Sequence, residues 1–161
     1  MSEPSETLSL ISELAIALAG FSGIVVVLGR RAGQLGPVDK RRLDNLFLHA
    51  ALALATSLLA LTLLHTSIQD TTVWRVTSAA WALPFPFVLV RDWRRVRAAG
   101  GPESPRMFAA AYTAGVLAFL LQVANSAFLY SGWPLFAALC LNLLLGFQQF
   151  VALLYARLGA A

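Results

Sequence analysis

One acidic residue, Glu13, lies inside the first long apolar run of the chain, at the start of ELAIALAGFSGIVVVLG. A carboxylate inside a bilayer is costly unless it faces water or a partner, so such residues mark cation sites, proton acceptors and rings of like charge in pores. Two structural alternatives stay open. The side chain can reach the membrane surface by snorkelling, or it can pair with Arg75, which enters the third apolar run from the same side.

The two histidines, His49 and His65, lie sixteen residues apart near the two ends of the second apolar run. On one helix they are separated by about 24 Å along the axis, so they cannot share a metal ion or a haem. Cys140 is the only cysteine, which excludes a multi-cysteine metal site. We therefore expect no metal and no cofactor. A proton relay through His49 and His65 is the chemical interpretation, and hydrogen-bonded packing is the structural one.

Small and amide side chains repeat along the last two apolar runs, and small residues share a face with Glu13 in the first. Such faces are typical of close helix packing in membranes, and the alternative is a polar lining for an ion or substrate path. The predicted packing positions are Gly20, Gly23, Gly115 and Gly146, and the candidate pore or ion residues beside Glu13 are Gln122, Asn125, Asn142 and Gln149.

Arginines follow the third apolar run at a spacing of three, at Arg91, Arg94 and Arg97, with Arg95 between them. Voltage sensors share this spacing, but here the arginines stand at the end of the run and a loop follows. We expect them to anchor to anionic lipid headgroups. The sequence has no nucleophile with a neighbouring base, no phosphate-binding glycine loop and no histidine–glutamate metal motif, so we do not expect an enzyme.

Five apolar runs must position these residues. Of the 161 residues, 58% are hydrophobic and 12% are charged, whereas soluble domains carry roughly 25% charged residues. We predict an all-α integral membrane bundle that forms a single membrane domain over residues 1–161, with helices long enough to cross a bilayer. The predicted spans are 8–28, 43–65, 73–90, 107–130 and 133–155.

The distribution of basic residues predicts the orientation. Eleven of the twelve Lys and Arg residues fall in the first loop, the third loop or the C-terminal end, and only Arg75 lies on the other side. The positive-inside rule therefore places the N-terminus outside and the C-terminus inside. Because topology accounts for the net charge of +4, the lipid bilayer is the expected partner and nucleic acid is not. The acidic start MSEPSE predicts that the first helix is not a removable signal peptide.

Two segments carry a resemblance: ELAIALAGFSGIVVVLGRR with GPVDKRRLDNLF, and ANSAFLYSGWPLFAALCLNLLLGFQQFVALLY. They cover 63 of the 161 residues and resemble a group of small, uncharacterised bacterial membrane proteins. The resemblance implies a multi-pass protein of the bacterial inner membrane with about five helices, and it brings no activity or functional residue.

Two functions stay open on these residues. The first is a homo-oligomeric ion channel or small transporter, with a polar path between subunits and Glu13 near its outer mouth. A chain of this length builds a path between copies more easily than within one copy. The second is a non-transporting membrane subunit or scaffold, which binds a partner complex through its small-residue faces and basic loops.

Overall fold

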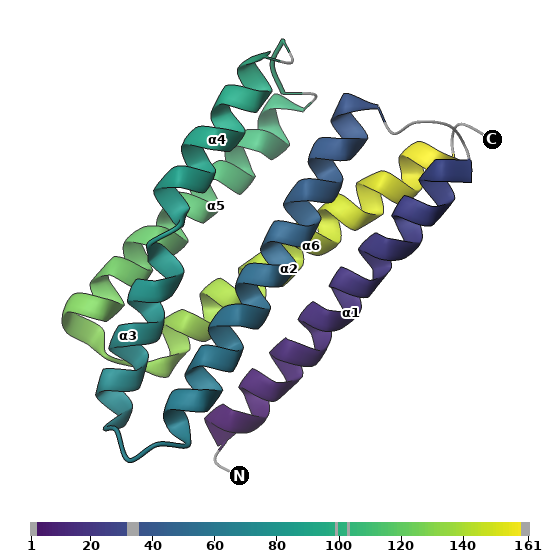
Figure 1. Ribbon diagram of the computed structural model, residues 1–161. Coiled ribbons are helices and arrows are strands. Elements are labelled where there is room, and N and C mark those ends of the chain that lie inside the picture. Colours follow the sequence, from purple (N-terminus) through teal and green to yellow (C-terminus); the bar gives the residue numbers. More distant parts are fainter. Residues whose placement is uncertain (1–2, 32–35, 99, 103, 159–161) are drawn as a thin grey trace. The chain divides into compact units, whose positions relative to one another are not determined.

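The computed structural model describes residues 3–31, 36–98, 100–102 and 104–158, and the secondary structure found there is helical, without strands (Figure 1). The elements are α1 (Glu3–Arg31), α2 (Pro37–Leu64), α3 (Asp70–Ala82), α4 (Phe85–Ala98), α5 (Pro105–Ala124), the π-helix η1 (Asn125–Leu129) and α6 (Gly132–Leu158). The prediction of an all-α fold is confirmed.

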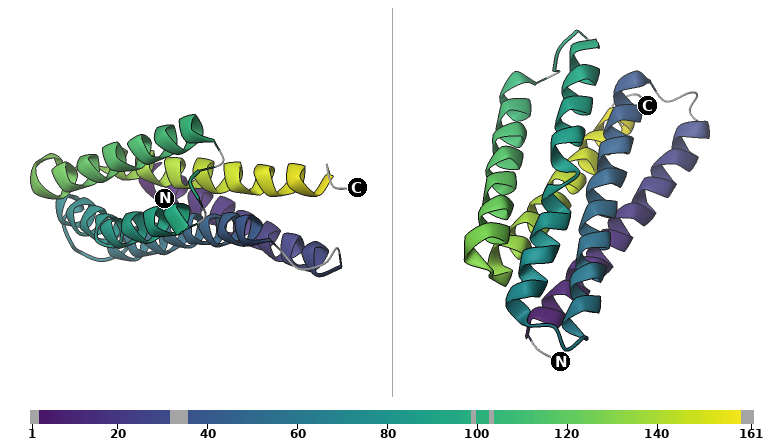
Figure 2. Two further views of the ribbon diagram at one scale, coloured as in Figure 1. Left: turned by 90° about the horizontal axis from the view of Figure 1, so that it is seen from above. Right: turned by 60° about the vertical axis from the view of Figure 1, so that its left-hand side comes forward.

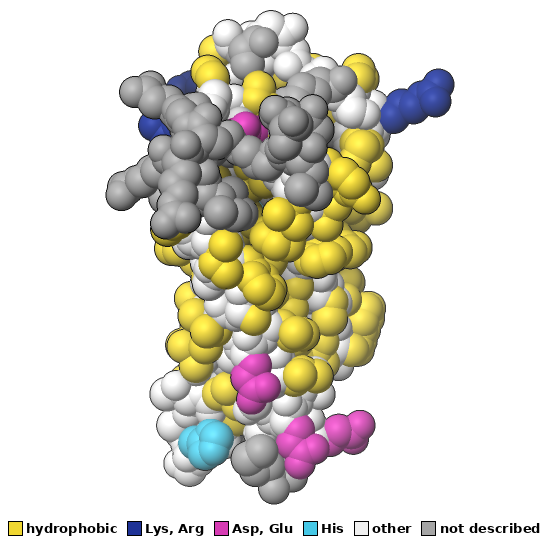
Figure 3. Space-filling model, turned by 90° about the vertical axis from the view of Figure 1, so that its right-hand side faces the viewer, with side chains coloured by type: hydrophobic (Ala, Val, Ile, Leu, Met, Phe, Trp, Pro, Cys, Tyr) yellow, Lys and Arg dark blue, Asp and Glu magenta, His cyan; other side chains and the backbone are white. Residues whose placement is uncertain are grey.

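Five segments are long and apolar enough to cross a membrane: Glu3–Ile24, Pro37–Leu64, Asp70–Ala98, Pro105–Leu129 and Gly132–Ala156. The prediction of five spans is therefore confirmed, and the chain is a multi-pass membrane protein. The second span begins earlier than predicted, because helix α2 continues through the charged sequence PVDKRR. On the face drawn in Figure 3, hydrophobic side chains cover the middle, with acidic side chains and a histidine toward the lower end.

The third span consists of two helices, because Pro84 and Pro86 interrupt it. Neither proline has a backbone N–H, so the helical hydrogen bonds to the carbonyls four residues earlier cannot form. The last bond of α3 runs from the Leu83 N–H to the Ala79 carbonyl at 3.0 Å, and the Val88 N–H donates to the Pro84 carbonyl at 3.1 Å at the start of α4. The helix is therefore interrupted between Ala82 and Phe85.

The described helices form two compact units. Unit 1 contains α1, α2 as far as Thr62, and α6 from Leu139 onward. Its core is built by Leu18, Leu46, Ala50 and Leu153. Leu18 lies on α1, Leu46 and Ala50 lie four residues apart on one face of α2, and Leu153 lies on α6, as expected for helices that bury one face.

Unit 2 contains residues 63–138, which comprise α3, α4, α5, η1 and the first turns of α6. Helix α5 and η1 pack against α3 (Figures 1 and 2). An aromatic stack joins three elements here, with Phe85 between Trp81 and Phe119 at centroid distances of 6.0 and 5.0 Å. Gly115 makes room for it, because a Cβ at that position would lie 3.3 Å from the Phe85 ring.

Candidate functional site

Helix α1 exposes Glu13 together with the small residues of its face. The exposed residues 13, 17, 20, 24 and 27 follow one another at intervals of four and three, so they form one line along the helix. We call this line the α1 stripe; it consists of Glu13, Ala17, Gly20, Ile24 and Val27. The opposite face is buried through Leu8, Ile11, Ala15 and Leu18.

No described residue of unit 1 occupies the α1 stripe. A Cβ added to Gly20 or to the neighbouring Gly23 would meet nothing within 4 Å. Glu13 is exposed, and it makes no hydrogen bond or ion pair with a described residue of unit 1. The packing predicted for Gly20 and Gly23 is therefore not provided by the described residues of unit 1.

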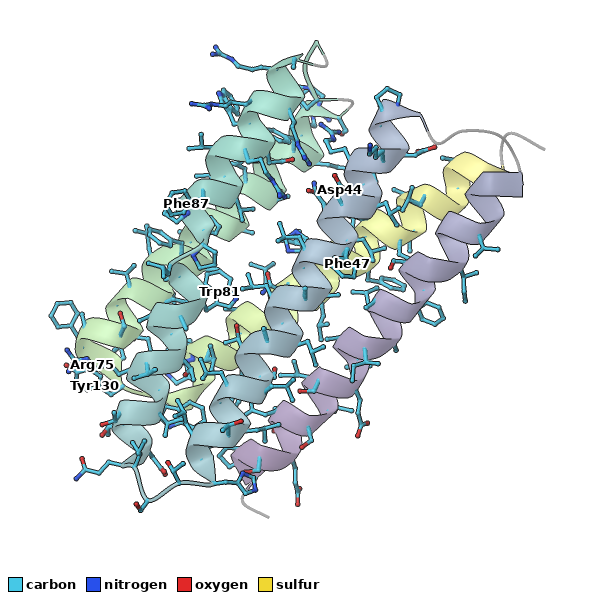
Figure 4. All side chains as sticks on the ribbon, viewed as in Figure 1. Asp44, Phe47, Arg75, Trp81, Phe87 and Tyr130 are labelled. Atoms are coloured by element: carbon cyan, nitrogen blue, oxygen red, sulfur yellow. The ribbon has the colours of Figure 1, made fainter. Side chains whose placement is uncertain are left out.

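Arg75, the predicted alternative partner of Glu13, lies over the ring of Tyr130, with its guanidinium carbon 5.8 Å from the ring centroid (Figure 4). Such a cation–π contact contributes about 0.5–1 kcal/mol at an exposed site. Tyr130 follows η1 in the left-handed conformation, with φ of 49°, and its N–H donates to the Asn125 carbonyl. A pair between Glu13 and Arg75 would join the two units and stays a prediction.

The predicted amides of the fourth span, Gln122 and Asn125, are fully buried in unit 2. The Asn125 amide nitrogen donates to the Ser78 hydroxyl at 2.7 Å and to the Ser131 carbonyl at 2.9 Å, and its oxygen accepts from the Ser131 N–H at 3.0 Å. Asn125 thereby ties the turn between η1 and α6 to helix α3. Gln122 donates to the Pro134 carbonyl at 2.7 Å, whereas its Oε1 has no partner among the described residues.

A second polar contact lies in unit 1, where His49 Nδ1 and Asn142 Oδ1 are 3.3 Å apart. Asn142 is buried, and its amide nitrogen has no hydrogen-bond partner within the described ranges. Gly146 lies one turn further along α6, where an added Cβ would come within 2.6 Å of Leu18 Cδ2 and 3.5 Å of His49 Cβ. The short distances show that α6 approaches α1 and α2 closely at this glycine.

The other predicted site residues lie apart from these contacts. His65 is exposed just after the end of α2, whereas His49 is half-buried within that helix. Gln149 is half-buried in α6. Arg91, Arg94, Arg95 and Arg97 are all exposed on α4.

Sequence reasoning missed Ser78 and Ser131, which complete the hydrogen bonds of Asn125. Single serines in an apolar segment carry no spacing signal. The only hint was the sequence SGWP, which predicts a turn at Ser131 and so a backbone in need of partners.

Within the ranges that the structure describes, no group of three or more His, Cys, Asp or Glu side chains could hold a metal ion. Comparison with protein families, with curated proteins and with solved structures finds no match to this chain.

Proposed function

We propose that this protein is a homo-oligomeric channel for small cations, in which copies associate along the α1 stripe and the Glu13 carboxylates gather around the path. The supporting observation is the exposed, unpartnered Glu13 on a face that also carries Gly20. Glu13 lies ten residues after Glu3, which is about 15 Å along the helix axis. Glu13 therefore lies well inside the first span, Glu3–Ile24.

The cost of exposing Glu13 to lipid drives this association. An acidic side chain at the centre of a membrane helix costs about 2.5–3.5 kcal/mol on insertion scales. When copies meet along the α1 stripe, their carboxylates leave the lipid and share a cation or a proton. Ala17 and Gly20 permit close approach of the backbones, which supplies the packing that holds membrane helices together.

The runner-up is a non-transporting assembly subunit that binds a partner complex. It is favoured by the burial of Gln122, Asn125 and Asn142, because amides enclosed in helix packing do not line a path between copies. A path along α1 then relies on Glu13 for its polar character. We infer the bacterial inner membrane as the location in both cases, on the resemblance of the two segments described above and on the helical spans.

The test combines subunit counting with cation flux. The purified protein is counted by native mass spectrometry in nanodiscs, and cation flux is measured in liposomes for the wild type, Glu13→Gln and Glu6→Gln. Glu6 is the matched control, because it is exposed on the same helix about two turns nearer the N-terminus. We expect a closed ring of several copies, with flux that falls at least tenfold in Glu13→Gln and is unchanged in Glu6→Gln.

The other outcomes separate the two functions. An oligomer without flux refutes the channel and supports the assembly subunit. Flux that is equal in Glu13→Gln and the wild type refutes the assignment of Glu13. A monomer refutes association along the α1 stripe.

A further inference from the structure

Basic side chains gather where the α4–α5 hairpin turns. Arg91, Arg94 and Arg97 lie on α4, and Arg106 lies in the first turn of α5. All four are exposed, and none makes a hydrogen bond or an ion pair with a described residue. Asp92 is the acidic side chain that the structure describes in this segment.

The turn places Arg106, at the start of α5, at the same end of the hairpin as Arg97. The Gly101 N–H donates to the Val96 carbonyl at 3.0 Å, and the Gly100 N–H donates to the Arg97 carbonyl at 3.1 Å. Gly100 has φ of 85°, a conformation that favours glycine and closes the end of a helix. Helix α4 therefore stops sharply, and α5 begins at Pro105 only a few residues later.

An aromatic cluster that consists of Trp93, Phe108 and Tyr112 lies beside the arginines. Trp93 lies 6.2 Å from Phe108 and 6.0 Å from Tyr112, measured between ring centroids. The guanidinium carbon of Arg97 is 5.5 Å from the centroid of the Trp93 ring. Arg97 makes no hydrogen bond with a described residue, so its N–H donors are available for an anion. The ring also restricts Arg97, which lowers the entropy lost on binding.

Planar N–H donors of this kind match the oxygens of a phosphate, which arginine binds in a bidentate manner. The surroundings favour a phosphate attached to a lipid over a free one. Val90, just before Arg91, and Met107, just after Arg106, are exposed apolar residues, and Trp93 is 43% exposed. Exposed apolar side chains beside a tryptophan and arginines are typical of the boundary between hydrocarbon and headgroups.

We propose that the arginine platform, consisting of Arg91, Arg94, Arg97 and Arg106 with the Trp93 ring, binds the headgroup phosphate of an anionic phospholipid. This site is independent of the proposed channel. It goes beyond a general attraction of basic loops to the membrane, because it depends on the geometry of Arg97 and Trp93 as well as on charge.

The experiment measures the ratio of phosphatidylglycerol to phosphatidylcholine retained by the protein, by native mass spectrometry after incubation with an equimolar mixture in detergent. We expect the wild type to prefer phosphatidylglycerol. Each arginine near an anionic surface contributes about 1 kcal/mol, so the ratio should fall about fivefold for each arginine removed in Arg94→Gln and Arg97→Gln. Lys40→Gln is the control, since Lys40 is an exposed basic residue on α2.

Two further variants separate a built site from diffuse attraction. Arg97→Lys keeps the charge but loses the planar donors. Trp93→Leu keeps every arginine but removes the ring that Arg97 contacts. Both should lower the ratio. The proposal is wrong if the wild type shows no preference, if Arg94→Gln and Arg97→Gln behave as Lys40→Gln does, or if Arg97→Lys and Trp93→Leu both keep the full ratio. Displacement of the lipid by excess inorganic phosphate would assign the site to a soluble anion and overturn the lipid proposal.

Discussion

Replacing Asn125 by alanine tests whether one buried amide holds unit 2 together. The substitution removes three hydrogen bonds, two to Ser131 and one to the Ser78 hydroxyl. Hydrogen bonds between membrane helices contribute about 0.6 kcal/mol each on average, and up to about 1.7 kcal/mol. Three of them sum to about 2 kcal/mol, and the Ser131 N–H left without its partner adds to this cost.

The assay is the free energy of unfolding in bicelles, obtained by SDS titration followed by circular dichroism. Asn125→Ala should lower this free energy by about 2 kcal/mol. Ser126→Ala is the control, because among the described residues the Ser126 hydroxyl bonds only to the Val123 carbonyl, three residues earlier. Ser78→Ala and the double variant complete a cycle that isolates the bond between helices, with an expected coupling of about 0.6–1.7 kcal/mol.

Two results would refute this reasoning. If Asn125→Ala costs no more than Ser126→Ala, then the three bonds make no net contribution to stability. If the coupling between Ser78 and Asn125 is zero, then their short distance reflects proximity without an energetic link between α3 and η1.

Two further pairs of variants test the packing of unit 1 with the same assay. Gly146→Ala should lower the free energy of unfolding by about 1 kcal/mol, because the new methyl group displaces the flexible Leu18 side chain. Gly36→Ala is the control, because a methyl group there meets open space outside the α1 stripe; it should be neutral or stabilising by up to about 1 kcal/mol. Equal losses in both variants would contradict the close contact at Gly146. His49→Leu should lower the free energy of unfolding by about 1–3 kcal/mol, because it leaves the buried Asn142 amide without its hydrogen bond. Asn142→Leu should lower it by less, because this variant also removes the amide nitrogen that has no partner among the described residues. The reverse order would contradict the assigned pair.

Local chemistry made much of the fold predictable. Apolar runs of this length have to be helical in a membrane, because each backbone N–H and C=O needs a partner within its own segment. The break in the third span was likewise predictable, because Pro84 and Pro86 lack backbone N–H groups wherever they stand. The sequence also singled out Glu13 by type alone, as an acidic residue in an apolar run.

Neighbouring helices decided the roles of the other candidates. Gly20 and Gly146 look alike in the sequence, yet Gly146 lies within reach of Leu18 and Gly20 faces open space. Asn125 was predictable as a polar residue on a small-residue face, but its partners Ser78 and Ser131 were not, since one lies 47 residues away along the chain. Sequence by itself determined which segments are helices and which side chains are costly in lipid, because both depend on a residue and its nearest neighbours. The tertiary structure alone decided which of those side chains are satisfied within the chain and which, like Glu13, face outward, because that depends on helices that the chain brings together from distant positions.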